Sequence, residues 1–283
     1  MILRTTAAAI AALTVLSSAS TDALAWGGRG HRIVAAVAAV LIPDKAARLD
    51  QIVQQLEMDN NFVDAASYPD EFIRNHDPGH QFGSWHFADL PDDSSQFDCT
   101  AQNCLFNALS KNLGILRQGN TDKDTAVAIT WVSHLVGDLH QPLHMTGRDR
   151  GGNDFHVKYR GQATCPNFSG GHARVELHSV WDDCLVEELT GGMSPQDFAK
   201  QLLGDITTFN GRPEVQGGGD APWLAWGDES HTLANSVGFD SLQENADLED
   251  PYIKGQGHAL DIVRQQLLVA GIRLAFLLDQ NFN

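Results

Sequence analysis

The sequence predicts an all-α protein that folds as a single multi-helix domain with one small β-hairpin inserted between helices. Apolar residues recur at spacings of three and four over most of the chain, and one short segment alternates apolar and polar residues instead. No internal repeat, linker or low-complexity stretch divides the chain. Its 283 residues, 42% of them hydrophobic, suffice for a large core, so we expect one domain over 26–283.

Helical spacing recurs along the chain, and residues at the starts of several segments agree with it. Asp44 follows Pro43, and Asp122 precedes the central segment, as is typical of helix N-termini. The predicted helices are 30–42, 44–57, 104–118, 125–140, 173–189, 194–206, 219–237 and 258–279. The strand-like segment, 154–161, reads DFHVKYRG and follows the turn-rich GRDRGG, which predicts the hairpin.

The first 25 residues have the composition of an export signal. Arg4 is followed by the apolar run 7–16 and then by the small-residue sequence ALA at 23–25, where a signal peptidase would cut. Cleavage there makes Trp26 the N-terminus of a mature protein that is secreted or periplasmic. The apolar run is shorter than the roughly 20 residues that span a bilayer, so we expect no membrane insertion.

Four cysteines in an exported chain predict two disulfides rather than free thiols, and three pairings are possible. We favour Cys99 with Cys104, because both lie in the short polar segment FDCTAQNC, and by elimination Cys165 with Cys184. No two cysteines have the C-x-x-C spacing that is typical of a cysteine-based zinc site.

The formal net charge of −17 argues against a protein that binds nucleic acid through a basic surface. Loss of residues 1–25 removes Arg4 and Asp22, one charge of each sign, so the mature chain keeps that net charge. Positive charge for a phosphate would therefore have to come locally, for example from bound metal.

Histidines and aspartates gather in a few short motifs. His134 and Asp138 are four residues apart, so on a helix they project from one face and can bind one metal ion together. His178 and Asp182 in LHSVWDD repeat that spacing. His144 lies just beyond a proline that ends or bends the helix, which lets its side chain turn back toward the same pocket.

Three more residues extend this candidate ligand set: His86 in SWHFAD, Asp70 in SYPDE, and His31 near the start of the mature chain. Taken singly, each has an ordinary structural explanation, such as a turn for Asp70. A single His-x-x-x-Asp pair on a helix can likewise be solvated or capped. Together, histidines and aspartates without cysteine are typical of catalytic zinc sites that keep one position open to water. The α-amino group of Trp26, once released, can also bind metal.

The motifs resemble, in order, the signature blocks of one known family. WGGRGH, SYPDE, SWHFAD, HLVGDLHQPLH, GGN and LHSVWDD are similar to those of the nuclease S-one/P-one family, zinc-dependent nucleases of fungi, plants and bacteria. The resemblance implies the all-α fold of zinc phospholipase C and nuclease P-one. It also implies an endonuclease that hydrolyses single-stranded DNA and RNA to 5′-nucleotides and has 3′-nucleotidase activity.

The resemblance further implies three Zn²⁺ ions and their ligands. The first zinc would be bound by Asp70, His86, His134 and Asp138, the second by His144, His178 and Asp182, and the third by Trp26, His31 and a bridging Asp138. Trp26 would contribute its amino nitrogen and carbonyl oxygen. Asp70 would also be catalytic, by orienting the attacking water or taking its proton.

Three residues are candidates for substrate contacts. Phe87 would stack on an unpaired base and Asp89 would bind a base edge, which favours single strands because a duplex hides its bases. Asn153 in GGN resembles the family residue that donates a hydrogen bond to phosphate and assists catalysis. Alternatively, Phe87 belongs to the core and Asn153 is a turn residue after two glycines.

Two positions depart from the family pattern. Fungal relatives place a lysine or arginine three residues after the aspartate of SYPDE, whereas this chain has Ile73, so Arg74, Arg148 or Arg150 would have to contact phosphate. His140 is an additional histidine that points away from the ligand face of its helix. We expect it to support a ligand or to pack, and not to bind metal.

Two other functions fit the same residues. A trinuclear-zinc phosphodiesterase of the phospholipase C type would use the same ligands, and the HFAD and GGN blocks favour a nuclease over it. A noncatalytic exported zinc-binding protein would bind metal but leave no position open to water. Nucleotides and single-stranded nucleic acid are the expected substrates, and no obligate protein partner is predicted.

Overall fold

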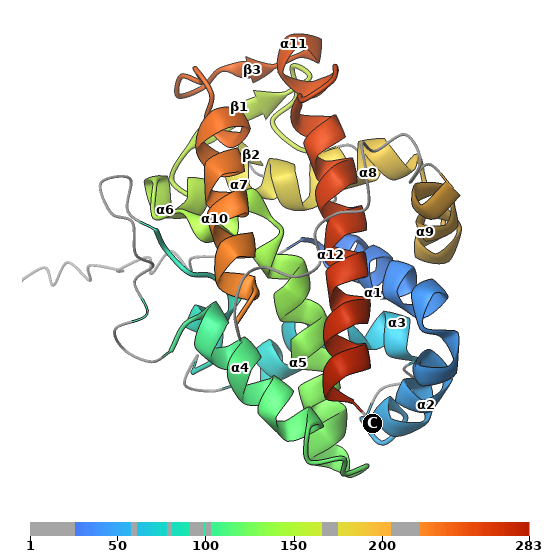
Figure 1. Cartoon of the computed structure of the whole chain (residues 1–283). Coiled ribbons are helices and arrows are strands. Elements are labelled where there is room, and N and C mark those ends of the chain that lie inside the picture. Colours follow the sequence, from blue (N-terminus) through green and yellow to red (C-terminus); the bar gives the residue numbers. More distant parts are fainter. Residues whose placement is uncertain are drawn as a thin grey trace, which may run out of the picture.

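A computed structural model describes residues 26–57, 61–77, 81–90, 99, 103–165, 175–204 and 221–282 (Figure 1). The predicted signal peptide, 1–25, lies outside this part of the chain. Within it, helices dominate and strands are few and short, so the predicted all-α class with a small β insertion is confirmed. No helix in the described ranges is both long and apolar enough to cross a bilayer.

Most of the predicted helices are present. They are α1 (Gly28–Leu41), α2 (Pro43–Val53), α4 (Leu105–Leu116), α5 (Lys123–Leu139), α9 (Pro195–Gly204), α10 (Trp223–Leu233) and α12 (Ala259–Asn281). The side chain of Asp122 accepts a hydrogen bond from the Thr125 backbone N–H at 2.9 Å and caps α5. Pro43 occupies the first position of α2, where its missing N–H costs nothing.

Short helical turns connect these helices and carry much of the site. They are α3 (Phe62–Ala65), η1 (Pro69–Ile73), η2 (Arg74–His76), η3 (Gly83–His86), η4 (Pro142–Met145), α6 (Asp149–Gly152), α7 (Leu177–Ser179), η5 (Val180–Cys184), α8 (Leu185–Thr190), η6 (Ala234–Gly238) and α11 (Asp250–Ile253). Of these, η1, η5 and η6 are π-helical, a wide turn that is common at functional sites.

The core lies between α1, α5 and α12. Figure 1 shows α12 running along the molecule, and α1 and α5 both pack against it. Gly271 of α12 lies directly against Val37 of α1, and a Cβ at this glycine would collide with that side chain. The two helices therefore approach closely. α5 packs against both, and its second half is completely buried.

The predicted helix 173–189 is confirmed from Leu177 onward and is wrong at Val175 and Glu176, where its described part begins. The segment starts as strand β2 (Val175–Glu176) and turns helical only at Leu177, because its backbone pairs with the neighbouring strand β1 (His156–Tyr159). The π-turn η5 then changes the helical phase before α8. Apolar spacing alone did not reveal this, since a two-residue strand leaves no alternation to recognise.

The predicted strand is confirmed, and its sheet is larger than a hairpin. β1 pairs antiparallel with β2, with His156 opposite Glu176, and parallel with β3 (Asp247–Leu248), with Lys158 opposite Asp247. The sheet order is therefore β2-β1-β3. The third strand comes from a distant segment, so no local pattern could have predicted it.

Both favoured disulfides are present. Cys99 is bonded to Cys104 and Cys165 to Cys184, with Cα–Cα distances of 5.4 and 4.9 Å. The second bond ties the end of β1's segment to η5, next to the LHSVWDD motif. Disulfides are typical of chains that fold in an oxidising compartment.

Candidate metal centre

The second half of α5 forms the base of the site. His134 and Asp138 lie on this buried part of the helix, one turn apart and both 0% exposed. The Nδ1–H of His134 donates to the Ala66 carbonyl oxygen at 2.9 Å, which leaves Nε2 as the nitrogen that carries a lone pair. The helix therefore presents an imidazole lone pair and a carboxylate on one face.

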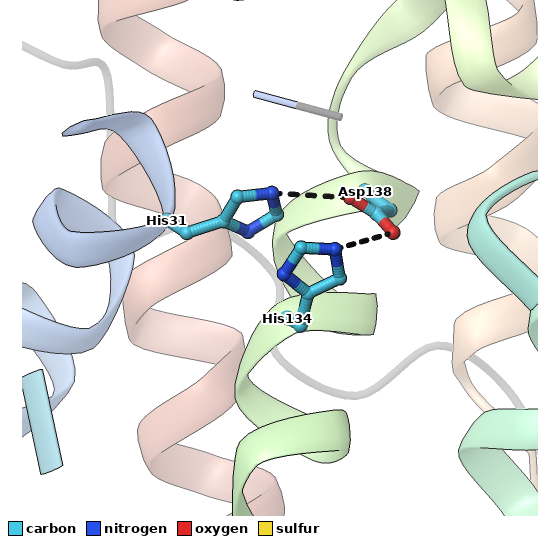
Figure 2. A group of neighbouring side chains, drawn as sticks. All are labelled: His31, His134 and Asp138. Carbon is cyan, nitrogen blue, oxygen red and sulfur yellow. Dashed lines mark ion pairs between the residues drawn. The ribbon is translucent and has the colours of Figure 1, made fainter. Parts of the chain in front are cut away.

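α1 brings His31 against this face of α5. The rings of His31 and His134 stack with their centroids 3.7 Å apart. Gly137 makes room for this approach, since a Cβ there would come within 2.6 Å of His31 Nδ1. Figure 2 shows Asp138 beside the two stacked rings, with Oδ1 3.4 Å from His31 Nε2 and Oδ2 3.5 Å from His134 Nε2.

Two further ligand candidates, Asp70 on η1 and His86 on η3, lie against His134 and Asp138 of α5. His86 Nδ1 lies 3.0 Å from His134 Nε2 and 3.2 Å from Asp138 Oδ2. Asp70, carried by the π-turn η1, has Oδ2 3.6 Å from His134 Nε2 and Oδ1 3.8 Å from His86 Nδ1. Asp138 thus faces His31 with one oxygen and the Asp70, His86 and His134 group with the other.

A third group forms where η4 meets the LHSVWDD segment. Pro142 starts η4 and turns His144 back toward the base of the site, as its position after a proline predicts. His144 Nδ1–H donates to the His86 carbonyl oxygen, and His178 Nδ1–H to that of Gly151, both at 2.6 Å. The two Nε2 atoms lie 3.1 Å apart, and His178 Nε2 is 3.2 Å from Asp182 Oδ2.

These contacts fit a bound cation better than they fit hydrogen bonds. With both Nδ1 protons donated to carbonyl groups, the Nε2 lone pairs of neutral His144 and His178 face each other, and a cation bound by both nitrogens would remove the repulsion between them. Among the described residues, Asp70 Oδ2 and Asp138 Oδ1 are buried without a hydrogen-bond partner. Zinc–nitrogen and zinc–oxygen distances near 2.0–2.2 Å suit all three groups of donors.

Burial shapes the protonation of the ligand candidates. It raises the pKa of Asp70 to about 7 and the pKa values of Asp138 and Asp182 above their usual range. It also lowers the pKa values of His134 and His144, so these imidazoles are neutral, the form that binds metal. Burial alone would also lower the pKa of His178, but the adjacent Asp182 carboxylate raises it overall.

Trp26 lies beside α1 and α5, two of the helices that carry these groups. Its side chain is completely buried and packs against Gly30 of α1, where a Cβ would come within 2.8 Å of the Trp26 Cβ. The next residue, Gly27, donates its N–H to the Asp182 carbonyl oxygen at 3.0 Å. In the uncleaved chain the Trp26 nitrogen is an amide, so its role as a ligand stays a prediction.

A cavity of about 430 Å³ opens above the ligand groups. Its lining includes the predicted ligands Asp70, His86, His144 and His178, and the predicted substrate contacts Phe87, Asp89 and Asn153. Phe87 is 42% exposed, so the alternative that it belongs to the core is wrong. The structure thus brings the three predicted substrate residues to one cavity, and their roles remain predictions.

Two of the three candidate phosphate-binding arginines line the cavity, and the third does not. Arg74 and Arg150 line it. Arg148 lies instead over the ring of Phe239, with its Cζ 4.3 Å from the ring centroid. Ile73, at the position where fungal relatives have a basic residue, packs against the hydrophobic core. Arg74 and Arg150 are therefore the candidates that the geometry retains.

The sequence marked 147–152 as turn-rich but did not predict the handedness of the turn. Residues 149–152 form a left-handed turn, with φ angles of 46°, 52°, 64° and 83°. Non-glycine residues pay about 1–2 kcal/mol each for this conformation. The turn places the Gly151 carbonyl oxygen against His178 and brings Asn153 to the cavity. The two glycines were the only sequence signal of its left-handed conformation.

His140 lies on the far side of the α5 terminus. Its Nδ1–H donates to the Val136 carbonyl oxygen at 2.7 Å, and its Nε2 accepts from Arg273 Nη1 at 3.0 Å. Arg273 also donates to Glu229 at 3.0 Å and stacks over Trp226. Because both ring nitrogens are engaged by the protein, His140 supports the end of the helix and does not join a ligand group.

Comparison with known proteins agrees with this geometry. The family model of the S1/P1 nucleases matches residues 26–283. Nuclease S1 of Aspergillus oryzae is 29% identical over 189 residues, which cover 62% of this chain and 62% of that protein, less than two thirds of its length. Nuclease P1 of Penicillium citrinum is 26% identical over 88% of this chain and 95% of its own.

Endonuclease 4 of Arabidopsis thaliana is 26% identical over 96% of this chain and 94% of its own length. The family match covers every ligand group described above, from His31 to Asp182. The chain therefore belongs to the S1/P1 nuclease family and is a nuclease, a hydrolytic enzyme.

Proposed function

We propose that this nuclease is a zinc-dependent endonuclease that hydrolyses single-stranded DNA and RNA to 5′-nucleotides and also acts as a 3′-nucleotidase. The observation that carries the proposal is the convergence of three His/Asp groups beneath a cavity with an exposed aromatic ring at its edge. Such groups suit three zinc ions, and the cavity can admit a nucleotide.

The ligands would divide as the family pattern implies. Asp70, His86, His134 and Asp138 would hold one zinc, His144, His178 and Asp182 a second, and Trp26, His31 and Asp138 a third. Asp138 suits the shared position because its two oxygens face different histidines. When bound, the ions supply positive charge that polarises phosphoryl oxygens, stabilises the leaving oxygen and lowers the pKa of a water molecule.

The chain's own residues would orient the reactants. Asp70 lies both in the ligand group and in the cavity lining, so its carboxylate can hold the attacking water or take its proton. Asn153 uses one N–H of its amide on the Arg150 carbonyl oxygen at 2.7 Å. The same nitrogen lies 3.3 Å from His178 Nδ1, whose proton is donated to the Gly151 carbonyl oxygen, so the second N–H of Asn153 can turn to a phosphate oxygen in the cavity. This supports the catalytic role proposed for the residue.

The cavity edge would select unpaired bases. An exposed phenylalanine such as Phe87 offers a face on which a base can stack, and duplex bases have no free face. Asp89, in the same lining, can accept hydrogen bonds from the amino edge of a base. Arg74 or Arg150 would pair with a phosphate, which the acidic remainder of the chain does not attract.

We propose further that the protein is exported and works in the periplasm or outside the cell. The two disulfides support an oxidising compartment. The signal sequence predicted at 1–25 would release Trp26 at cleavage, so the proposed third metal site would be completed only in the exported form.

The test offers purified mature protein single-stranded DNA, single-stranded RNA and phosphatidylcholine side by side, before and after chelation. We expect cleavage of both nucleic acids to 5′-phosphorylated products, its loss in chelator and its recovery with zinc. Hydrolysis of phosphatidylcholine alone would instead support the phospholipase C alternative. Bound zinc without turnover on any substrate would support a noncatalytic zinc-binding protein.

A further inference from the structure

Gln141 stands between two of the ligand groups without belonging to either. It follows α5 and immediately precedes Pro142, and its side chain is completely buried. Its backbone N–H donates to the Asp138 carbonyl oxygen at 2.9 Å, and its carbonyl oxygen accepts from His144 N–H at 3.0 Å. Its backbone therefore joins a ligand of one group to a ligand of another.

The side-chain amide of Gln141 makes two short hydrogen bonds in opposite senses. Its Oε1 accepts from the Leu143 backbone N–H at 2.6 Å, which caps η4. Its Nε2 donates to Asp182 Oδ1 at 2.7 Å. The backbone N–H of Leu143 can only donate, so the amide oxygen must face it and the NH₂ group must face Asp182.

This arrangement leaves Asp182 one oxygen for a cation. Oδ1 is taken by the amide, and Oδ2 lies 3.2 Å from His178 Nε2, inside the third ligand group. A neutral amide is the suitable donor here, because a lysine would repel a metal ion and a carboxylate would repel Asp182. Asp138 differs, since Asp138 Oδ1 is buried and has no hydrogen-bond partner in the described part of the chain.

We infer that Gln141 is a positioning residue for the proposed His144, His178 and Asp182 zinc site, which it holds by capping η4 and by restricting Asp182 to one coordinating oxygen. The inference rests on the proposed function, because it concerns how one zinc is held. It applies to one of the three ions, since the side-chain hydrogen bonds of Gln141 in the described part of the chain reach Asp182 and Leu143 and no ligand of the other two groups.

The first experiment replaces Gln141 with methionine, which keeps the volume and removes both hydrogen-bonding ends of the amide. Gln266→Met, at a buried glutamine of α12 away from the ligand groups, is the matched control. Zinc affinities are measured by competition with a chelator. We expect one zinc of Gln141→Met to bind roughly 10–100-fold more weakly, with the others and the control unchanged.

Two further measurements keep the inference testable if Gln141→Met folds poorly. Gln141→Glu keeps the acceptor for Leu143 N–H but loses the donor to Asp182, so it should also weaken one zinc. Cobalt substitution reports geometry directly, and the absorption of one cobalt should change in both variants. In an Asp182→Asn background, Gln141→Met should add little further loss, because both changes act on the same ligand.

The outcomes separate this inference from the proposed function. Unmodified protein that binds no zinc overturns both. Unmodified protein with its full complement of zinc, together with Gln141 variants whose affinities and cobalt spectra match the control, overturns only the inference. Effects of Asp182→Asn and Gln141→Met that simply add would do the same, since they would show that the two residues act independently.

Discussion

Two polar clusters with buried histidines lie on either side of the end of α5, and they differ in how these histidines are satisfied. The first, the ligand groups, contains His144 and His178, whose Nε2 atoms face each other at 3.1 Å. The second, which we name the His140 cluster, consists of His140, Arg273 and Glu229. There the Nε2 of the histidine accepts a hydrogen bond from an arginine at 3.0 Å, and that arginine is paired with the glutamate.

The difference shows what distinguishes a metal site from a structural polar cluster. In the His140 cluster the buried Nε2 lone pair of His140 meets a donor of this chain, so burial of the imidazole requires no outside ion. In the ligand groups, lone pairs and carboxylate oxygens converge on one another, and Asp70 and Asp138 each leave one buried oxygen without a hydrogen-bond partner in the described ranges. A bound cation would satisfy these convergent lone pairs and carboxylate oxygens together.

The largest expected effect comes from removing the shared carboxylate of the ligand groups. Asp138→Asn keeps the shape of the side chain but removes the negative charge that faces His31 and His134. Loss of a residue that only hydrogen-bonds to a metal ligand can lower activity roughly 100-fold. Because Asp138 is proposed to bind metal directly, we expect nuclease activity to fall by more than this, together with loss of bound zinc. Glu229→Gln, in the His140 cluster, is the control and should keep its zinc, as elemental analysis would report. Full zinc content in Asp138→Asn would contradict the proposal that the ligand groups, unlike the His140 cluster, hold metal through this carboxylate.

The next effect concerns the predicted amino-terminal ligand. Adding one alanine before Trp26 in the mature protein moves the α-amino group away while leaving every side chain of the ligand groups in place. We expect one of three zinc ions to be lost and activity to fall with it. Three tightly bound zinc ions in the extended protein, measured after dialysis, would rule out this ligand.

A substitution in the His140 cluster should lower the stability of the protein and leave its zinc content unchanged. Arg273→Met leaves the buried His140 Nε2 without its donor, which costs about 1–3 kcal/mol of unfolding free energy. Denaturant unfolding of the metal-loaded protein measures that loss. Zinc stoichiometry should stay the same, and a loss of zinc in this variant would mean that the two clusters are not independent.

The smallest effect is expected at the cavity. Arg74→Gln removes a guanidinium that lines the cavity near Asp70, and we expect the apparent KM for single-stranded DNA to rise about tenfold, the equivalent of one charge-assisted hydrogen bond of ~1.5 kcal/mol. Arg148→Gln is the matched control, because Arg148 lies over Phe239 and outside the lining. Equal effects of the two variants would contradict a specific contact by Arg74.

Local patterns predicted much of this fold and site because they act over one or two helical turns. The spacing of His134 and Asp138 placed both on one face of α5, and the turn at Pro142 brought His144 back, as expected. The start of the predicted helix 173–189 was wrong because β2 depends on a partner strand, and β3 was missed because its partner is distant. The left-handed turn at 149–152 was missed because two of its residues are not glycine.

The sequence by itself determined the donor types of the metal centre, the i, i+4 pairing of two ligand pairs, the helical class and the family. These depend on residue chemistry and helical period, which are local. Only the tertiary structure decided that His144 faces another imidazole while His140 faces an arginine 133 residues away. The reason is physical: whether a buried lone pair needs a cation depends on which donor the packing of α12 against α5 brings to it.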